Sequence, residues 1–108
     1  MTTKVSLTVK IDSGVETYMA SWCPTGDTVD EKDVSFNSKN IGALGNLSAG
    51  DYDIFWGLFG TPGSSITLTL SGDDGSQIAT FDDQIQAGKS TRSNGAFFTM
   101  AADVGGEK

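Results

Sequence analysis

The sequence predicts an all-β protein: an antiparallel β-sandwich of about seven strands, immunoglobulin-like or similar, with a small β-barrel as the alternative. Short segments alternate apolar and polar residues, turn-type segments separate them at intervals of roughly ten residues, and no segment has a convincing amphipathic helical pattern. The chain of 108 residues is long enough for one core. We therefore expect a single domain over residues 1–101, followed by a flexible tail over 102–108.

The first two predicted strands flank an Asp-Ser-Gly segment at 12–14. Residues 4–11, KVSLTVKI, place four apolar side chains on one face, namely Val5, Leu7, Val9 and Ile11. Residues 15–23, VETYMASWC, carry β-favouring residues on both faces. Because Asp-Ser-Gly is typical of a tight turn, we expect these two strands to form a hairpin.

The middle of the chain is less regular. A polar loop at 24–33 precedes a short strand around Val34 and Phe36. The glycine-rich stretch 40–50 is expected to be an irregular connection between sheets, although 41–48 has a weak helical pattern.

The second half of the chain contains the clearest strand patterns, at 51–59, 65–71, 76–81 and 95–101. Residues 72–75, GDDG, predict a hairpin loop. Residues 82–87 are a second weak helix candidate, and Asn94 and Gly95 predict either a bulge or an additional hairpin turn. The strand count is therefore open by one.

The strand at 51–59, DYDIFWGLF, is apolar on both faces. Alternation places Tyr52, Ile54, Trp56 and Leu58 in the core, which leaves Phe55 and Phe59 on the outer face with Asp51 and Asp53. In one explanation the 40–50 connection or the tail covers Phe55, while Phe59 curls around the rim. In a second, both rings lie in a homodimer interface. In a third, they line a ligand or partner surface with the two aspartates as its polar edge.

An exposed aromatic ring beside carboxylates suits either a sugar or a basic, proline-rich or aromatic peptide. The segment LSAGDYDIFW at 47–56 resembles the Leu-x-x-Gly-x-Tyr-x-Ile strand segment of accessory β-sandwich domains, from carbohydrate-binding modules to bacterial immunoglobulin-like repeats. This resemblance implies a fold more than a function. We expect a non-catalytic binding or protein-interaction module, with a carbohydrate-binding, lectin-like domain as the first alternative and an assembly or surface-antigen subunit as another.

Charge narrows the choice of partner. The net charge of −7 repels nucleic acid and anionic membranes, so the expected partners are proteins or carbohydrates, with a homodimer as an option. Residues 1–10 lack the apolar run of a signal peptide, and no segment approaches transmembrane length. We therefore expect no membrane insertion, and either a cytoplasmic protein or one exported without a cleaved signal; the compartment itself stays unknown.

Acidic loops make calcium the one cofactor to consider. The candidate ligands are Asp27 and Asp30, with Glu31 and Asp33 nearby, and Asp73 and Asp74; Asp82 and Asp83 form a further acidic pair. Calcium takes six to eight oxygen ligands, which such loops could supply if they converged. None of them has the Asp-x-Asp-x-Asp-Gly spacing of a helix-flanked calcium loop, so the pattern alone specifies no site.

One segment suggests catalysis. VKIDSG at 9–14 resembles the active-site triplet of retroviral-type aspartic proteases, which implies a dimeric enzyme in which Asp12 pairs with its counterpart. However, Val15 stands where a small residue is usual, and no downstream apolar-Ile-Gly segment supports the triplet. The chain also has no histidine and a single cysteine, Cys23, so neither a Cys-His pair nor a dithiol site can form. We therefore expect no enzyme activity.

Overall fold

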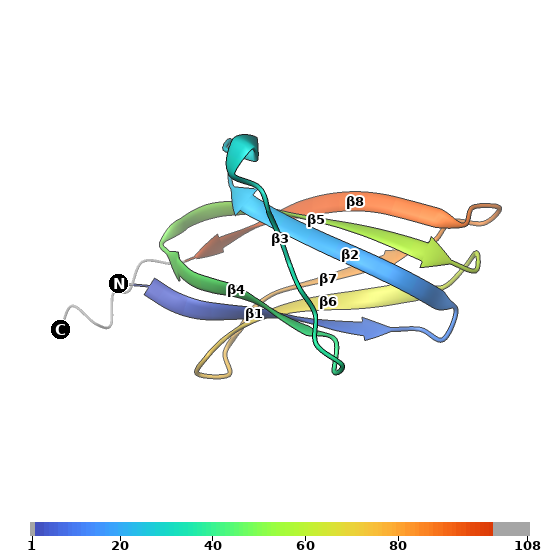
Figure 1. Cartoon of the computed structure of the whole chain (residues 1–108), viewed down its shortest axis with the longest axis horizontal. Helices are drawn as coiled ribbons and strands as arrows, with labels where there is room; N and C mark the ends of the chain where they lie inside the picture. The colour runs from blue at the N-terminus through green and yellow to red at the C-terminus, as the bar shows by residue number, and fades with distance from the viewer. Residues whose placement is uncertain (1, 101–108) are drawn as a thin grey trace.

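The computed structural model describes residues 2–100 as two four-stranded antiparallel sheets packed as a sandwich (Figure 1). The β1 sheet has the strand order β4-β1-β6-β7, and the β2 sheet has the order β3-β2-β5-β8. The elements are β1 Thr2–Ile11, β2 Val15–Pro24, the 3₁₀ helix η1 Thr28–Asp30, β3 Lys32–Asp33, β4 Ile41–Ser48, β5 Gly50–Gly60, β6 Ser65–Gly72, β7 Gln77–Gln84 and β8 Thr91–Met100. The predicted sandwich is confirmed with eight strands, and the described strands do not close into a barrel.

The predicted irregular connection at 40–50, with its weak helix at 41–48, is wrong. These residues form β4, which pairs antiparallel with β1 and contributes Leu44 and Leu47 to the core. Its glycines hide the alternation, since buried Gly42 has no apolar side chain. Gly45 adopts a φ of 99°, where the pairing with β1 shifts register, so it serves a bulge and not a loop.

The predicted hairpin between the first two strands is also wrong. β1 and β2 lie in different sheets, and the turn that joins them crosses from one sheet to the other. The turn itself forms as expected, because the Val15 amide donates to the Asp12 carbonyl at 3.0 Å. β4 and β6 occupy both edges of β1, so β2 pairs with β5 instead.

Three other predicted features also differ from the structure. Asn94 and Gly95 form neither a bulge nor a turn, because they pair in regular register with β5 inside β8. The weak helix candidate at 82–87 is wrong, since its first residues end β7 and the rest turn toward β8. The short strand lies earlier, at β3, and Phe36 makes a single bridge to Gly42. The predicted tail at 102–108 lies outside the described residues.

The core lies between the sheets and contains the predicted apolar faces. Within β5, the residues Tyr52, Ile54, Trp56 and Leu58 are all buried, as predicted. Tyr52 stacks on Phe98 with ring centroids 5.4 Å apart and lies 5.8 Å from Trp22. Ile11 departs from the pattern: it ends β1 and is 38% exposed.

One long side of the sandwich is closed by residues 34–40, which we name the strap. The strap hydrogen-bonds to both sheets: the Val34 amide donates to Ala20 of β2 at 2.9 Å, and Phe36 bridges Gly42 of β4. Tyr18 of β2 packs edge-on against Phe36 at 4.9 Å. Figure 1 shows the strap running from β3 across to the start of β4.

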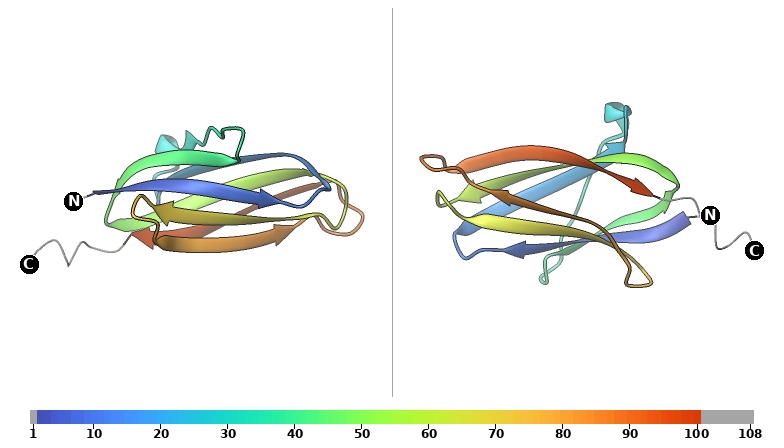
Figure 2. Two further views of the ribbon diagram at one scale, coloured as in Figure 1. Left: turned by 90° about the horizontal axis from the view of Figure 1, so that it is seen from below. Right: turned by 180° about the vertical axis from the view of Figure 1, so that it is seen from behind.

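The opposite long side is closed where β7 and β8 meet (Figure 2). Asp83 of β7 points between the sheets and is buried. It accepts hydrogen bonds from Trp56 Nε1 at 2.7 Å and Arg92 Nε at 3.0 Å, both of which belong to the β2 sheet. Phe81 stacks on Trp56 beside this network, with centroids 5.7 Å apart. Among residues 2–100, no helix has the length and apolar character needed to cross a membrane.

Candidate functional site

The outer face of the β2 sheet carries an apolar surface centred on β5. Strand pairing aligns Met19, Gly57 and Ser93 in one row across β2, β5 and β8. The adjacent row aligns Ser21, Phe55 and Gly95. Each of these two rows therefore combines one large apolar side chain, one glycine and one serine.

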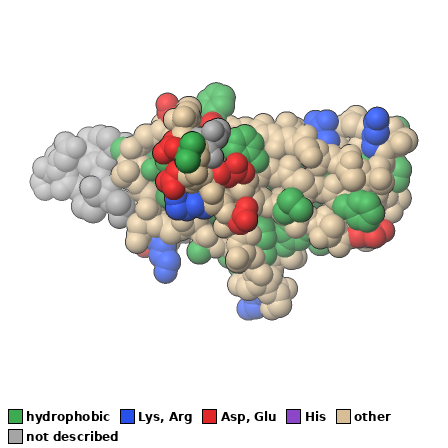
Figure 3. Space-filling view, turned by 45° about the horizontal axis from the view of Figure 1, so that its top comes forward, with side chains coloured by type: hydrophobic (Ala, Val, Ile, Leu, Met, Phe, Trp, Pro, Cys, Tyr) green, Lys and Arg blue, Asp and Glu red, His purple; other side chains and the backbone are tan. Residues whose placement is uncertain are grey.

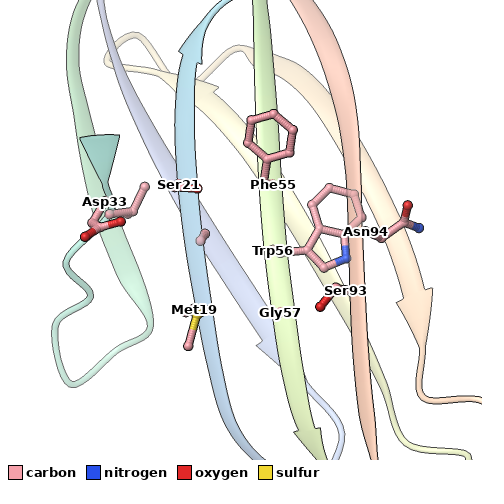
Figure 4. Close-up of a pocket in the computed structure, with 10 residues that line it drawn as sticks. Met19, Ser21, Asp33, Phe55, Trp56, Gly57, Ser93 and Asn94 are labelled. Atoms are coloured by element: carbon pink, nitrogen blue, oxygen red, sulfur yellow. The ribbon is translucent and has the colours of Figure 1, made fainter. Parts of the chain in front are cut away.

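These rows form an open groove with a volume of about 710 Å³ (Figure 4). It runs across the sheet and is lined by Met19, Ala20, Ser21, Asp33, Val34, Phe55, Trp56, Gly57, Ser93 and Asn94. Gly57 keeps the floor open, since a Cβ there would meet nothing nearer than the exposed Met19 side chain at 3.4 Å, with the Arg92 carbonyl oxygen at 4.0 Å. A volume of this size is in the range of ligand-binding clefts in proteins.

Phe55 is positioned by the strand beside it. A Cβ added to Gly95 would lie 2.8 Å from Cδ1 of Phe55, so the ring packs against the Gly95 backbone and needs the absence of a side chain there. The ring is half-buried, which leaves part of it available to the groove. Gly95 therefore has a packing role that the turn prediction for Asn-Gly did not include.

Carboxylates border the groove on the side of β3. Asp33 lines it directly, and Glu31 accepts a hydrogen bond from the hydroxyl of Ser21, another lining residue. The neighbouring cation Lys32 is 2.9 Å from Asp30 and lies 5.5 Å from the centre of the Trp22 ring. Figure 3 shows acidic side chains gathered around the η1 loop on this face. The groove is thus apolar along its floor and acidic at one border.

The structure brings together only part of the predicted site. Phe55 lines the groove, whereas Phe59 is on the same face, 44% exposed, and outside the lining. Asp51 and Asp53 lie farther along β5, where Asp51 accepts a hydrogen bond from Thr99 at 2.8 Å and Asp53 accepts one from Thr25 at 3.1 Å. Asp33, and not these two aspartates, is therefore the carboxylate at the groove.

Two segments, the 40–50 connection and the tail, were predicted as alternatives to cover Phe55, and the first of these alternatives is wrong. The 40–50 segment is mostly β4 in the other sheet and so does not lie over Phe55. The other proposed cover, the tail, lies outside the described residues. Phe97 is a further aromatic residue on this face and is 72% exposed, while its neighbour Phe98 is buried.

Most of the groove lining could not be recognised from the sequence. Met19 and Ser93 give weak signals individually, because their importance depends on which strands lie beside β5. The available signal was that 15–23 carries β-favouring residues on both faces, since the structure buries Ala20 and Trp22 and leaves Met19 exposed on the other face. The alignment of Met19 with Gly57 depends on the pairing of β2 with β5, which the predicted hairpin had assigned differently.

The calcium candidates do not converge. Asp27 and Asp30 lie around η1, whereas Asp73 and Asp74 lie in the β6–β7 turn, on the opposite side of the sandwich (Figures 1 and 2). Asp74 accepts a hydrogen bond from the Ser76 amide at 2.9 Å, and hydrogen bonds from Ser76 lower its pKa. Across residues 2–100, no three Asp, Glu or Cys side chains form a group suited to a metal ion.

The two residues considered for catalysis are in ordinary structural settings. Asp12 is exposed in the turn between β1 and β2, and its carboxylate accepts a hydrogen bond from Ser13 at 3.3 Å. Cys23 is fully buried. Burial, and then the nearby carboxylates of Asp53 and Glu31, raise the pKa of its thiol, which favours the unreactive protonated form.

Comparisons with protein-family models, with curated proteins and with solved structures found no match to this chain.

Proposed function

We propose that the protein is a non-catalytic binding module that holds its ligand in the groove across the β2 sheet. The observation that carries this proposal is the groove itself: an exposed Met19, a half-buried Phe55 and an open floor at Gly57 occur on one sheet face. The outer face of the β1 sheet provides the contrast. One of its rows aligns Ile41, Thr8, Thr69 and Thr80, and the one apolar side chain there, Ile41, is 37% exposed, against 70% for Met19. Exposed apolar surface gathered in a hollow is typical of a binding site.

We also propose that the sandwich is immunoglobulin-like. The chain changes sheets at the turn after β1, as immunoglobulin-type chains do between some consecutive strands. The proposal also leaves the chain without an enzymatic role. Two observations support that part: Asp12 is exposed in a turn, and burial raises the pKa of Cys23, which disfavours its nucleophilic thiolate form.

A carbohydrate-binding domain is the second candidate. The part of Phe55 that faces the groove could pack against a sugar ring, and Ser93, Asn94 and Asp33 provide polar groups around it. This candidate predicts binding of neutral oligosaccharides and no dependence on the charge of Asp33. Calcium assistance would require ligands beyond those that the described loops bring together.

Amide chemical-shift mapping with the variant Gly57→Thr tests the proposed function. Titration with neutral oligosaccharides and with basic, acidic and proline-rich peptides should shift the amides of Met19, Gly57 and Ser93 for at least one class of probe. Gly57→Thr fills the floor with a residue that strands favour, so it should abolish binding without loss of stability. Thr69→Val, on the outer face of the other sheet, is the matched control. Absence of shifts with every class, or equal binding by Gly57→Thr, would overturn the proposal.

A further inference from the structure

We infer that the ligand of this groove is an extended basic peptide, bound through a lysine or arginine side chain that lies between Phe55 and Asp33. The inference rests on the proposed binding function of the groove and adds the chemistry of the partner. Its basis is the combination of an apolar floor, an acidic border and an adjacent edge strand.

Charge is the first argument. Asp33 is the one charged side chain among the residues that line the groove. Glu31 accepts a hydrogen bond from the lining residue Ser21, so a second carboxylate lies at the same border. The nearby cations already have partners: Lys32 contacts Asp30 at 2.9 Å, and Arg92 contacts Asp83 at 3.0 Å. The border therefore keeps a negative charge that its neighbours do not compensate, which favours a cationic ligand.

The apolar floor selects a cation with a long aliphatic chain. Met19 is 70% exposed beside Gly57, and its thioether offers a flexible surface for methylene groups. The partly exposed Phe55 ring attracts a cation through the negative face of its π-system. Lysine and arginine combine an apolar stem with a charged head, so they match both the floor and the border.

The extent of the groove and the neighbouring strand favour a peptide over a free amine. A volume of about 710 Å³ exceeds what one lysine side chain fills, so adjoining parts of the ligand also have room. Ser93 and Asn94 carry the groove to β8, which has β5 as its one strand neighbour within the described residues. An extended peptide can reach the unpaired backbone groups of such an edge, whereas a small amine cannot.

Charge also argues against a second copy as the occupant. Each chain has a net charge of −7, so two copies repel one another. A basic segment instead complements the acidic border and is attracted by the field of the whole protein. Proteins that present lysine or arginine at alternate positions of an exposed, extended segment are the partners that fit.

The experiment titrates the protein with a capped heptapeptide that carries lysine at alternate positions, and follows the amides of Gly57 and Ser93. The same peptide with glutamate in place of lysine, and lysine amide alone, are the comparison ligands. We expect the lysine peptide to bind, the glutamate peptide not to bind, and lysine amide to bind more weakly. Asp33→Asn should weaken the lysine peptide by about threefold to fivefold, and raised salt should weaken it further.

Asp12→Asn is the matched control, since it removes an exposed aspartate in a distant turn and should leave the affinity unchanged. Equal affinity of Asp33→Asn and wild type for the lysine peptide would overturn the inference. Binding of a neutral oligosaccharide at the same amides, with no response to the lysine peptide, would also overturn it while the binding function of the groove stands. Light scattering over a hundredfold concentration range on wild type and Phe55→Ser covers the remaining case: a dimer that the substitution dissociates would make a second copy the occupant.

Discussion

The two long sides of the sandwich are closed by different kinds of interaction. On the side of β2 and β4, the strap joins the sheets by backbone hydrogen bonds and by the packing of Tyr18 on Phe36. On the side of β7 and β8, a buried carboxylate, Asp83, joins them by bonds to Trp56 and Arg92. The strap side therefore depends on close packing, and the β7–β8 side depends on an ionised group.

This difference determines how each side responds to mutation and to pH. Neutral backbone bonds and ring contacts do not change with protonation, so the strap should be insensitive to acid. The buried Asp83 carboxylate accepts hydrogen bonds from Trp56, Arg92 and the Gln84 amide, so it stabilises the fold less when it is protonated, and its removal leaves those donors without an acceptor. The following predictions separate the two sides, beginning with the largest expected effect.

Asp83→Ala should destabilise the protein by about 2–4 kcal/mol, because it leaves the Trp56 indole N–H and the Arg92 guanidinium without their buried partner. Urea unfolding followed by tryptophan fluorescence measures the change. Asp82→Ala, at the neighbouring exposed position, is the control and should cost much less. A loss no larger than that of the control would show that the network does not hold this side closed.

Gly42→Val should destabilise the strap side by about 1–3 kcal/mol, through overpacking. A Cβ at this position would overlap Val34 and lie 2.9 Å from the Ser35 carbonyl, so the strap must move. Hydrogen exchange should then increase at Val34 while the exchange of β8 stays unchanged. Gly57→Val, in an open part of a strand, is a matched control that should not destabilise the protein.

Acid should weaken the β7–β8 side first. Burial raises the pKa of Asp83, but bonds from Trp56, the Gln84 amide and Arg92 outweigh it and hold the pKa below its usual value. The stabilisation is therefore fully present above the unfolded-state value of about 3.9 and is lost as the pH falls through the folded-state pKa. The free energy of unfolding, measured by urea from pH 7 down to pH 2, should fall more steeply with pH for wild type than for Asp83→Asn. An equal dependence on pH in the two proteins would contradict this.

Tyr18→Phe should have the smallest effect, about 0.5–1.5 kcal/mol. It removes the hydroxyl that donates to Asn40 Oδ1 at 2.6 Å and keeps the ring that packs on Phe36. Because the bond joins neutral groups below the tyrosine pKa, the loss should be the same at pH 7 and at pH 4. A loss that grows toward acid would mean that the strap side also contains an ionisable contact.

The sequence patterns predicted the strands that alternate clearly, because burial on one face leaves a direct mark on residue order. They did not predict β4, since its glycines carry no hydrophobic signal. They also assigned β1 and β2 to a hairpin, because an Asp-Ser-Gly turn has the same composition whether it stays in one sheet or crosses to another. Local chemistry specifies the turn, and only long-range pairing specifies its neighbours.

The same limit applies to the site. Phe55 could be identified from one strand, because its own alternation places it outside the core. Its partners in the groove outside β5 come from three other strands and the strap, so Asp33 and Met19 were not recognisable without the pairing. Asp83 illustrates the reverse case. From the sequence it was grouped with the acidic calcium candidates, whereas in the structure it lies between the sheets and contacts Arg92 and the Trp56 indole.

The central position of β1 has a consequence for how the chain folds during synthesis. Its two neighbours, β4 and β6, are encoded far downstream, and the second of them becomes available only after residues 65–72 have emerged from the ribosome. Until then β1 has at least one unpaired edge and an apolar face without its full cover. Such dependence on distant pairing is characteristic of domains that fold in milliseconds to seconds, and it makes the interval before β6 appears the period in which the nascent chain most needs protection from aggregation.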